Sequence, residues 1–366
     1  MEDFNSYHLS AEMLRAIKEI GFVSPTKIQQ KTIPYLLENE TDFLGQAHSG
    51  TGKTAAFGIP LLEKLNATNK NVQSIILAPT RELTVQISIE LRRLGKYKNI
   101  RILPVYGGQD IGIQIRALKK KVQIVVGTPG RILDHIRRNT LDLWHIRYLI
   151  LDEADEMLDR GFREELENIL HHIAKDKHTW LFSATVPLEI RKIADRYMTS
   201  PYEILVNKKQ LLRDNIAHRY YVVSEQAKLN SLCHIIKQNK NIYGIVFCRT
   251  RVMVAKLAET LRNKGYNADC LHGDMTQFQR DRVMQSFRAH NIDLLVATDI
   301  AARGLDIDNL THVINYCIPR DFKTYVHRIG RTGRVNNKGV ALTFALPSEK
   351  RLIRDFVRHT NRAWDF

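Results

Sequence analysis

Near its N-terminus the chain carries the stretch Phe43-Leu44-Gly45-Gln46-Ala47-His48-Ser49-Gly50-Thr51-Gly52-Lys53-Thr54. The apolar residues Phe43 and Leu44 predict the entry of a buried strand, and the glycines predict a tight loop. The residues after Thr54 are compatible with a helix. A strand, a glycine-rich loop and a helix in this order are the first half of a βαβ unit, so the stretch predicts an α/β fold.

Short apolar runs rich in β-branched residues recur after this stretch, and they predict buried parallel strands at 72–78, 100–105, 122–126, 148–151 and 179–182. Amphipathic stretches lie between the runs and predict helices, for example at 82–94 and 163–173. Strands that alternate with helices indicate a doubly wound parallel sheet, in which ligands bind at the carboxyl ends of the strands.

The same alternation restarts after a polar, basic stretch at 207–215, with strands predicted at 243–248, 268–271, 293–297, 312–316 and 339–344 and a final helix at 351–365. The sequence therefore predicts two tandem α/β domains with doubly wound parallel sheets. We expect the first domain at residues 1–205, a short linker at 206–215 and the second domain at 216–366.

The charge of the chain is strongly positive and unevenly distributed. Its 366 residues include 55 Lys and Arg against 39 Asp and Glu, a net charge of +16. Residues 1–205 contribute +3 of this and residues 206–366 contribute +13. Such an excess favours a polyanionic partner, although composition alone is equally compatible with solubility or the loss of an acidic tail.

Several classes of protein are disfavoured. The four cysteines are widely spaced and form no Cys-x-x-Cys pair, which predicts free thiols in a reducing compartment and no zinc site. We expect the pair His171-His172 to be exposed on a helix. The first ten residues do not resemble a signal peptide, and no apolar run reaches the length of a membrane span. We therefore expect a cytoplasmic protein without a membrane partner.

The glycine-rich loop has the composition of a phosphate-binding site. Backbone N–H groups of Ser49, Gly50, Thr51 and Gly52 are expected to face the phosphates of a nucleotide. Lys53 is placed to reach the β- and γ-phosphates, and the hydroxyl of Thr54 to bind Mg²⁺. A glycine-rich turn without function, or the phosphate loop of a kinase or GTPase, are the alternative interpretations.

An acidic stretch further along the chain favours a phosphate-binding site among these alternatives. The predicted strand 148–151 ends in Asp152-Glu153-Ala154-Asp155, and carboxylates that leave a buried strand are unfavourable unless a cation compensates them. We expect Asp152 to hold Mg²⁺, partly through water, and Glu153 to orient and deprotonate the attacking water. The sequence thus predicts hydrolysis of a nucleoside triphosphate.

In these residues the chain resembles a DEAD-box ATP-dependent RNA helicase, and it is most similar in character to the bacterial members. The family takes its name from the one-letter code of Asp152 to Asp155. The resemblance covers nearly the whole chain and implies two RecA-like domains. The adenine-recognition element of the family matches Phe4, Gly21-Phe22, Pro25-Thr26 and Gln29. It implies that Phe22 packs on adenine and that Gln29 hydrogen-bonds its edge.

The resemblance also assigns roles to residues of both predicted domains. It implies that RNA is contacted by residues of several loops: Pro79, Thr80, Arg81, Gly108, Thr128, Arg131, Arg249, Gln279, Arg282 and Thr298. It implies that ATP state is linked to domain closure by Asp155, Ser183, Thr185 and His327. Asp306 would lie near the ATP ribose, and the guanidinium groups of Arg331 and Arg334 would act as arginine fingers.

The family behaviour implies that ATP-Mg and single-stranded RNA bind across an interdomain cleft and that hydrolysis reopens it. Short RNA duplexes would be unwound locally, or RNA–protein complexes remodelled, through backbone contacts with weak sequence preference. Proteins of RNA processing or decay are possible partners. A DNA translocase of the same superfamily and an ATP-gated RNA clamp are the two rival functions. The charge runs Lys119-Lys120-Lys121 and Arg137-Arg138 either extend the RNA path or are solvated helix faces, the interpretation we favour.

Overall fold

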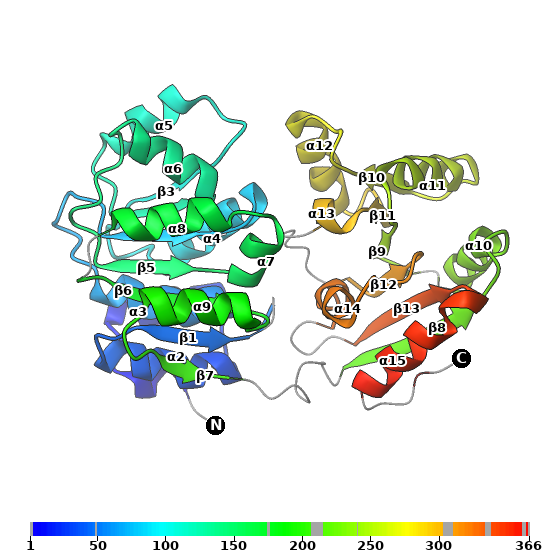
Figure 1. Ribbon diagram of the computed structural model, residues 1–366, viewed down its shortest axis with the longest axis horizontal. Helices are drawn as coiled ribbons and strands as arrows, with labels where there is room; N and C mark the ends of the chain where they lie inside the picture. The colour runs from blue at the N-terminus through cyan, green and yellow to red at the C-terminus, as the bar shows by residue number, and fades with distance from the viewer. Residues whose placement is uncertain are drawn as a thin grey trace. The chain divides into compact units, whose positions relative to one another are not determined.

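The computed structural model describes residues 3–47, 50–173, 176–205, 215–239, 241–302, 310–333, 338–360 and 364. The chain divides into two compact units, residues 1–206 and 207–366. Most of the segment expected to be the linker, 206–214, lies outside the described residues. Helices and strands of both units are labelled in Figure 1.

The first unit begins with helical elements and continues as an alternation of strands and helices. Its elements are η1 (Phe4–Tyr7), α1 (Ala11–Ile20), α2 (Lys27–Glu38), β1 (Phe43–Gln46), α3 (Lys53–Lys64), β2 (Ser74–Leu77), α4 (Arg81–Leu94), β3 (Ile102–Val105), α5 (Ile111–Leu118), β4 (Ile124–Gly127), α6 (Pro129–Arg137), β5 (Tyr148–Leu151), α7 (Ala154–Asp159), α8 (Arg163–His172), β6 (His178–Ser183), α9 (Leu188–Tyr197) and β7 (Tyr202–Ile204).

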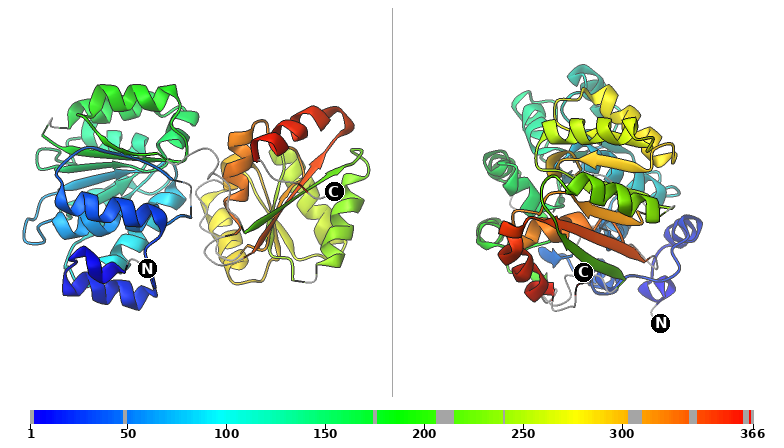
Figure 2. Two further views of the ribbon diagram at one scale, coloured as in Figure 1. Left: turned by 90° about the horizontal axis from the view of Figure 1, so that it is seen from below. Right: turned by 90° about the vertical axis from the view of Figure 1, so that its right-hand side faces the viewer.

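The described strands of this unit form one parallel sheet in the order β3-β4-β2-β5-β6-β1-β7. Helices cover both of its faces (Figure 2). Alternate residues of each strand enter opposite cores: Ile150 packs in the cluster with α1 to α4, and Leu149 and Leu151 pack in the cluster with α6 to α9. Burial on both faces explains why these strands are continuous apolar runs.

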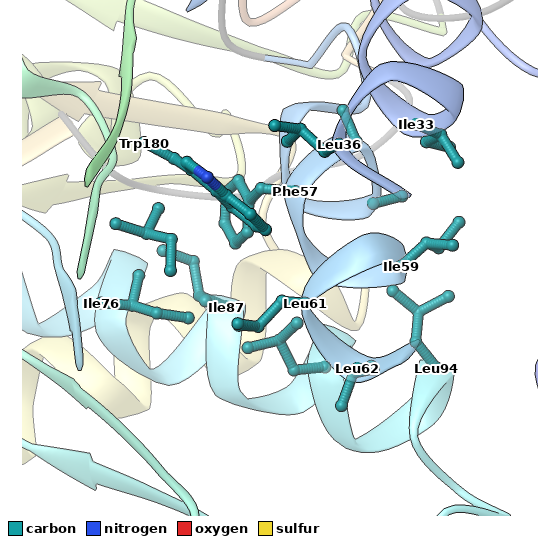
Figure 3. Close-up of a cluster of buried hydrophobic side chains, with 14 of the residues drawn as sticks. Ile33, Leu36, Phe57, Ile59, Leu61, Leu62, Ile76, Ile87, Leu94 and Trp180 are labelled. Atoms are coloured by element: carbon teal, nitrogen blue, oxygen red, sulfur yellow. The ribbon is translucent and has the colours of Figure 1, made fainter. Parts of the chain in front are cut away.

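The core beneath α3 and α4 shows how this burial fixes the phosphate loop. Phe57 of α3 lies beside Trp180 of β6, and Leu61 of α3 points toward Ile87 of α4 (Figure 3). These side chains are almost completely buried. Each such side chain contributes about 1.5–3 kcal/mol through removal from water. The helix that starts at Lys53 is therefore held rigidly against the sheet.

The second unit repeats the alternation. Its elements are β8 (Ile216–Val222), α10 (Lys228–Gln238), β9 (Gly244–Phe247), α11 (Arg251–Asn263), β10 (Ala268–Leu271), α12 (Gln277–Arg288), β11 (Leu294–Ala297), α13 (Asp299–Ala302), β12 (His312–Asn315), α14 (Phe322–Ile329), β13 (Gly339–Ala345), η3 (Pro347–Glu349) and α15 (Lys350–Thr360). Within the described residues its parallel sheet has the order β10-β11-β9-β12-β13-β8, again between two helical layers.

Two tandem doubly wound parallel sheets confirm the predicted fold class. The expected strand bounds agree closely with the structure, and 148–151 and 268–271 agree at both ends. The edge strands β7 and β8 were not predicted. β8 alternates buried and exposed residues in its first half, and β7 has only three residues, so neither forms a continuous apolar run.

Candidate functional site

The glycine-rich loop leaves β1 and turns into α3 through two residues in left-handed backbone conformation. Gly50 has φ 73° and Gly52 has φ 85°, values that favour glycine. A Cβ atom added to Gly52 would lie 2.4 Å from Nε2 of Gln29, so a side chain there would also displace a neighbour. The loop therefore requires glycine at position 52 for both conformation and space.

Gln29 and Thr26 fasten the loop to the start of α2. Nε2 of Gln29 donates to the carbonyl of Gly52 at 3.1 Å, while its Oε1 accepts from the Thr26 backbone N–H at 2.9 Å. The Thr26 hydroxyl donates to the Thr51 carbonyl at 2.8 Å. A side-chain amide has further donor and acceptor capacity, so these bonds leave Gln29 able to recognise a base. Phe22 stacks on Phe4, with ring centroids 6.3 Å apart.

Lys53 and Asp152 form a buried pair at the carboxyl ends of the strands. Nζ of Lys53 lies 3.5 Å from Oδ1 of Asp152, and both side chains are at most 5% exposed. Burial raises the pKa of Asp152, and the Lys53 ammonium opposes that rise. Within the described residues, Lys53 Nζ has no hydrogen-bond partner. An ammonium group that is buried and lacks hydrogen bonds is costly, which indicates a site built for an anionic ligand.

Glu153 adopts an unusual backbone conformation beside this pair. Its φ of 52° is left-handed, and it precedes the first residue of α7. Its backbone N–H donates to Oδ1 of Asp152 at 2.9 Å. Such a conformation costs on the order of 1 kcal/mol or more for a residue other than glycine, and strain of this kind concentrates at functional sites.

Asp155 connects the acidic stretch to the segment Ser183-Ala184-Thr185 at the end of β6. Its Oδ2 accepts from both the backbone N–H of Thr185, at 3.1 Å, and the Thr185 hydroxyl, at 2.6 Å. The Ser183 hydroxyl accepts from the Asp155 N–H at 3.3 Å and donates to the Thr185 carbonyl at 2.7 Å. The structure thus brings together the three predicted coupling residues of the first unit.

The loops that follow β2 and β3 also meet. The Arg81 guanidinium lies over the Tyr106 ring, 4.6 Å from its centroid, and its Nη1 would be 3.9 Å from a Cβ on Gly108. Thr80, which follows Pro79, caps α4 by accepting from the Leu83 N–H at 3.1 Å. These predicted RNA-contacting residues therefore lie together at the carboxyl edge of the sheet, with Arg81 and Gly108 at its surface and Pro79 and Thr80 buried beneath it.

A buried network that the sequence analysis missed joins the loop after β4 to this surface. Thr128 precedes α6, and Arg131 on that helix donates to the carbonyl of Gln109 at 3.0 Å. Gln114 accepts from Arg131 at 3.3 Å and lies 3.1 Å from Nε2 of His135, with both Gln114 and His135 buried. Arg131 thus holds the loop in place. A glutamine on the apolar helix 111–118 was the one sequence signal of this network.

In the second unit the predicted arginine cluster lies at the end of α14, and the two of its arginines that the structure describes, Arg328 and Arg331, are both buried. Arg328 is buried, pairs through both ends of its guanidinium with Asp299 at 2.6 and 2.8 Å, and donates to Asn315 at 3.0 Å. Arg328 therefore has a structural role, because it joins α14 to α13 and to the end of β12. Arg331 and His327 line a small hollow next to it.

The other predicted RNA-contacting residues of this unit lie at the carboxyl ends of β9 and β11 and on α12. Arg249 is exposed and lies 3.5 Å from Glu349, and the Thr298 hydroxyl accepts from the Ala301 N–H at 3.3 Å. Gln279 and Arg282 line a hollow of about 610 Å³. Gln279 also caps its own helix by accepting from the Thr276 N–H at 2.8 Å, so its position has a structural explanation. Three predicted site residues, Ser49, Asp306 and Arg334, lie outside the described part of the chain.

A glycine-rich loop between a parallel strand and a helix, with a buried Lys–Asp pair behind it, defines a class of nucleoside triphosphate-binding α/β proteins. Family models place the chain further: residues 26–193 match the DEAD/DEAH box helicase model, and residues 227–336 match the helicase conserved C-terminal domain model. The chain is similar to the DEAD-box ATP-dependent RNA helicase CshA of Bacillus licheniformis, with 49% identity over 99% of this chain and 74% of that protein. The homologue from Geobacillus kaustophilus is 50% identical over 99% of this chain and 77% of its own length.

Solved structures give the same assignment. Saccharomyces cerevisiae Dbp5 bound to RNA and ADP BeF3 is similar with a TM-score of 0.91, at 31% identity over 100% of this chain and 95% of that chain. A DEAD box protein from Methanococcus jannaschii is 44% identical over 99% and 98% of the two chains, with a TM-score of 0.60. The chain therefore belongs to the DEAD-box helicase family. Among its described helices, none has the length and apolarity of a membrane span.

Proposed function

We propose that this DEAD-box helicase hydrolyses ATP when single-stranded RNA is bound and uses the cycle to open short RNA duplexes or remodel RNA–protein complexes. Membership of the family makes the chain an ATP-dependent RNA helicase, that is, an RNA-dependent ATPase. The observation that carries the site assignment is the buried Lys53–Asp152 pair, whose ammonium lacks a hydrogen bond within the described residues. A nucleotide phosphate supplies the partner that this ammonium needs.

The first unit carries the nucleotide. Backbone N–H groups of the loop from Ser49 to Gly52 face the phosphates, and Lys53 neutralises the β- and γ-phosphates. Phe22 and Gln29 bind adenine, and the bonds from Gln29 to Gly52 and from Thr26 to Thr51 link base recognition to the shape of the loop. A base that Gln29 cannot bind would thereby also disturb the phosphate site.

The residues beside the loop fit Mg²⁺. A buried carboxylate, Asp152, lies opposite Lys53, and Thr54 follows in the first turn of α3, where its hydroxyl is a second oxygen donor. Oxygen ligands of this kind are those that Mg²⁺ prefers, and Asp152 is suited to act partly through water. When bound, the ion would neutralise charge on the phosphate oxygens. The burial that raises the pKa of Asp152 also strengthens its attraction to a cation.

Hydrolysis requires residues of both units in this proposal. Glu153 accepts the proton of the attacking water. Asp155 couples movements of the acidic stretch to Ser183 and Thr185 through the hydrogen bonds described above. The second unit supplies the guanidinium groups of Arg331 and Arg334 to the transferring phosphoryl group, with Asp306 at the ribose and His327 at the Ser183–Thr185 segment. The proposed domains span 1–205 and 216–366 with a linker at 206–215, bounds that are supported by the division of the chain after residue 206.

RNA is bound by the loops at the carboxyl ends of the strands. Glycines, helix N-termini and Arg81 present donors and positive charge to phosphates, so sequence preference is weak. In the second unit, Arg249, Thr298 and Arg282 serve the same purpose. Proteins of RNA processing or decay are the expected partners, and the cytoplasm the expected location, because the described cysteines are free thiols.

RNA-dependent ATPase activity tests the proposal. Steady-state turnover is measured with saturating ATP-Mg alone, with single-stranded RNA and with DNA of the same sequence. We expect strong stimulation by RNA and weak stimulation by DNA, because the 2′-hydroxyl distinguishes the two at backbone contacts. Equal stimulation by DNA would favour a DNA translocase, and RNA binding with almost no turnover would favour an ATP-gated clamp.

A further inference from the structure

Three neighbouring strands of the first sheet each have an exposed cation at their amino end. Lys70 precedes β2, Arg101 directly precedes β3 and Lys121 precedes β4, and these strands are adjacent and parallel in the order β3-β4-β2. Lys119 and Lys120 follow the last residue of α5 and are exposed as well. We call these five residues the amino-end cluster. They lie at the edge of the sheet opposite to Thr80, Gly108 and Thr128.

A buried glutamine holds the segments of this cluster together. Gln123 donates through Nε2 to the Asn69 carbonyl at 2.8 Å and accepts at Oε1 from the Arg101 backbone N–H at 2.9 Å. The Arg101 guanidinium in turn donates to the carbonyl of Lys120 at 2.6 Å. The segments that carry Lys70, Arg101 and Lys120 are therefore fixed to one another.

The cluster brings like charges together without compensation. Lys70, and to a smaller extent Arg101, lowers the pKa of Lys121, which places the three cations near one another. None of the five cations forms an ion pair with any residue in the described ranges. Lys121 also has a left-handed φ of 63°. The helix dipole favours Lys119 and Lys120 at the end of α5, but it does not explain Lys70, Arg101 or Lys121.

The helix α5 connects this cluster to the RNA-contacting edge. It begins three residues after Gly108 and ends at Leu118, so its eight residues span about 12 Å. Its exposed residues Ile113 and Arg116 are three positions apart and so lie on one face of the helix, and Lys119 and Lys120 follow directly after its end. Figure 1 shows α5 at the outer end of the unit, beside α6 and β3. Between the loop at Gly108 and the cluster, α5 thus carries one exposed cation, Arg116, and one carboxylate, Asp110, which caps its first turn.

We propose that an RNA strand leaving the loop at Gly107-Gly108 continues along α5 and binds through its phosphates to the amino-end cluster. The chemistry favours RNA over an acidic protein, because four of the five cations are lysines, which are depleted in protein interfaces but bind phosphates readily as point charges. Ile113 is the one large apolar residue exposed along the described path, so an apolar anchor for a protein partner is small. The inference rests on the proposed RNA-dependent function and extends its binding site.

Binding of short and long RNA to the full chain tests this path. A cluster variant, Lys70→Gln with Lys120→Gln and Lys121→Gln, retains Arg101 and its structural bonds. The control variant changes three exposed lysines of the same unit, Lys18→Gln, Lys31→Gln and Lys192→Gln, and so removes the same charge. Dissociation constants are measured by fluorescence anisotropy over a range of salt concentrations with a non-hydrolysable ATP analogue. The RNAs have about 10 and about 30 nucleotides, because one binding module typically covers about 4–16.

We expect wild-type protein to bind the longer RNA more tightly, and the cluster variant to lose on the order of ten-fold of that affinity. The slope of log affinity against log salt should fall by about 2, at about 0.7 per phosphate contact on a single strand. The affinity of the cluster variant for the short RNA should stay within about two-fold of the wild-type value. The affinities of the control variant for both RNAs should stay within the same limit.

Unchanged long-RNA affinity in the cluster variant, or an equal loss in the control variant, would overturn the proposed path. Binding of polyglutamate, an acidic polypeptide, is measured in the same assay. If the cluster variant loses this binding but retains its affinity for the long RNA, the proposed path is wrong and the cluster is a protein-binding surface. Failure of wild-type protein to bind even the short RNA would instead contradict the proposed function, so the two failures are distinguishable.

Discussion

The two units use the same fold around a buried lysine for different purposes. Lys53 is the first residue of α3, the helix after β1, and Lys228 is the first residue of α10, the helix after β8. Both lysines are at most 5% exposed. β1 and β8 occupy corresponding positions in the two sheets, as do β5 and β12.

The surroundings of the two lysines differ. Lys53 faces Asp152 at the end of β5 and follows a loop with two left-handed glycines. Lys228 pairs with Glu225 at 2.8 Å and lies over the ring of Tyr316, which follows β12, 5.8 Å from its centroid. Since Glu225 already compensates Lys228 and the connection 223–227 contains no glycine, this lysine is structural. Function in this pair of domains therefore depends on the loops rather than on the fold.

The largest expected effect concerns the contribution of the second unit to hydrolysis. Arg331→Ala should reduce RNA-stimulated turnover on the order of 10³-fold or more, the usual scale for an arginine finger, with little change in ADP affinity. Arg331→Lys should restore little, because the ammonium lacks the planar fork. Arg354→Ala on the exposed face of α15 is the control. Near-normal turnover of folded Arg331→Ala would remove this residue from catalysis.

A second large effect should come from the first unit. Glu153→Gln should slow hydrolysis on the order of 10²- to 10⁴-fold, the range for loss of a general base, while ATP and RNA still bind. RNA should then stay trapped with ATP, which slow dissociation in an RNA release assay would reveal. Fast release and normal turnover would exclude Glu153 as the base.

The two equivalent lysines allow a direct comparison of intermediate size. Lys53→Ala should weaken nucleotide binding on the order of 10- to 100-fold, because it removes a charged hydrogen bond to phosphate. Lys228→Ala should leave nucleotide affinity unchanged and destabilise the second unit by about 1 kcal/mol. Isothermal titration with ADP and urea unfolding measure the two effects. An equal loss of ADP affinity in both variants would contradict the distinction between the units.

The smallest expected effect is a pH dependence of stability that is specific to the second unit. Burial, together with Arg219, lowers the pKa of His312 in β12 to about 4. His312 binds a proton more readily in the unfolded chain than in the folded one. Its contribution to the free energy of unfolding is therefore fully present above about pH 6.5 and is lost as the pH falls toward 4. From pH 7.5 to 5.5 the second unit should lose about 1 kcal/mol, measured by hydrogen exchange of β12. His312→Gln should abolish the loss, whereas exposed His171→Gln should not.

The sequence allowed most of the fold and the local parts of the site to be predicted. Strands buried on both faces are continuous apolar runs, and the phosphate loop lies within one short stretch, so both are readable without a structure. Hydrogen bonds between residues that are distant in the sequence cannot be read in this way. The network of Arg131, Gln114 and His135, for example, spans 21 residues. The structural roles of Arg328 and Lys228 depend on partners such as Asp299 and Tyr316 that only the fold brings near.

The central claim is that the first unit binds the nucleotide but cannot hydrolyse it without the second. The direct test is RNA-stimulated ATPase activity of a fragment ending at Val206, compared with the intact chain at saturating ATP and RNA. The fragment contains a complete sheet with both helical layers, so it should fold and bind ADP. We predict ADP binding by the fragment without RNA-stimulated turnover, and stimulated turnover by the intact chain alone. Substantial RNA-stimulated hydrolysis by the fragment would contradict the account.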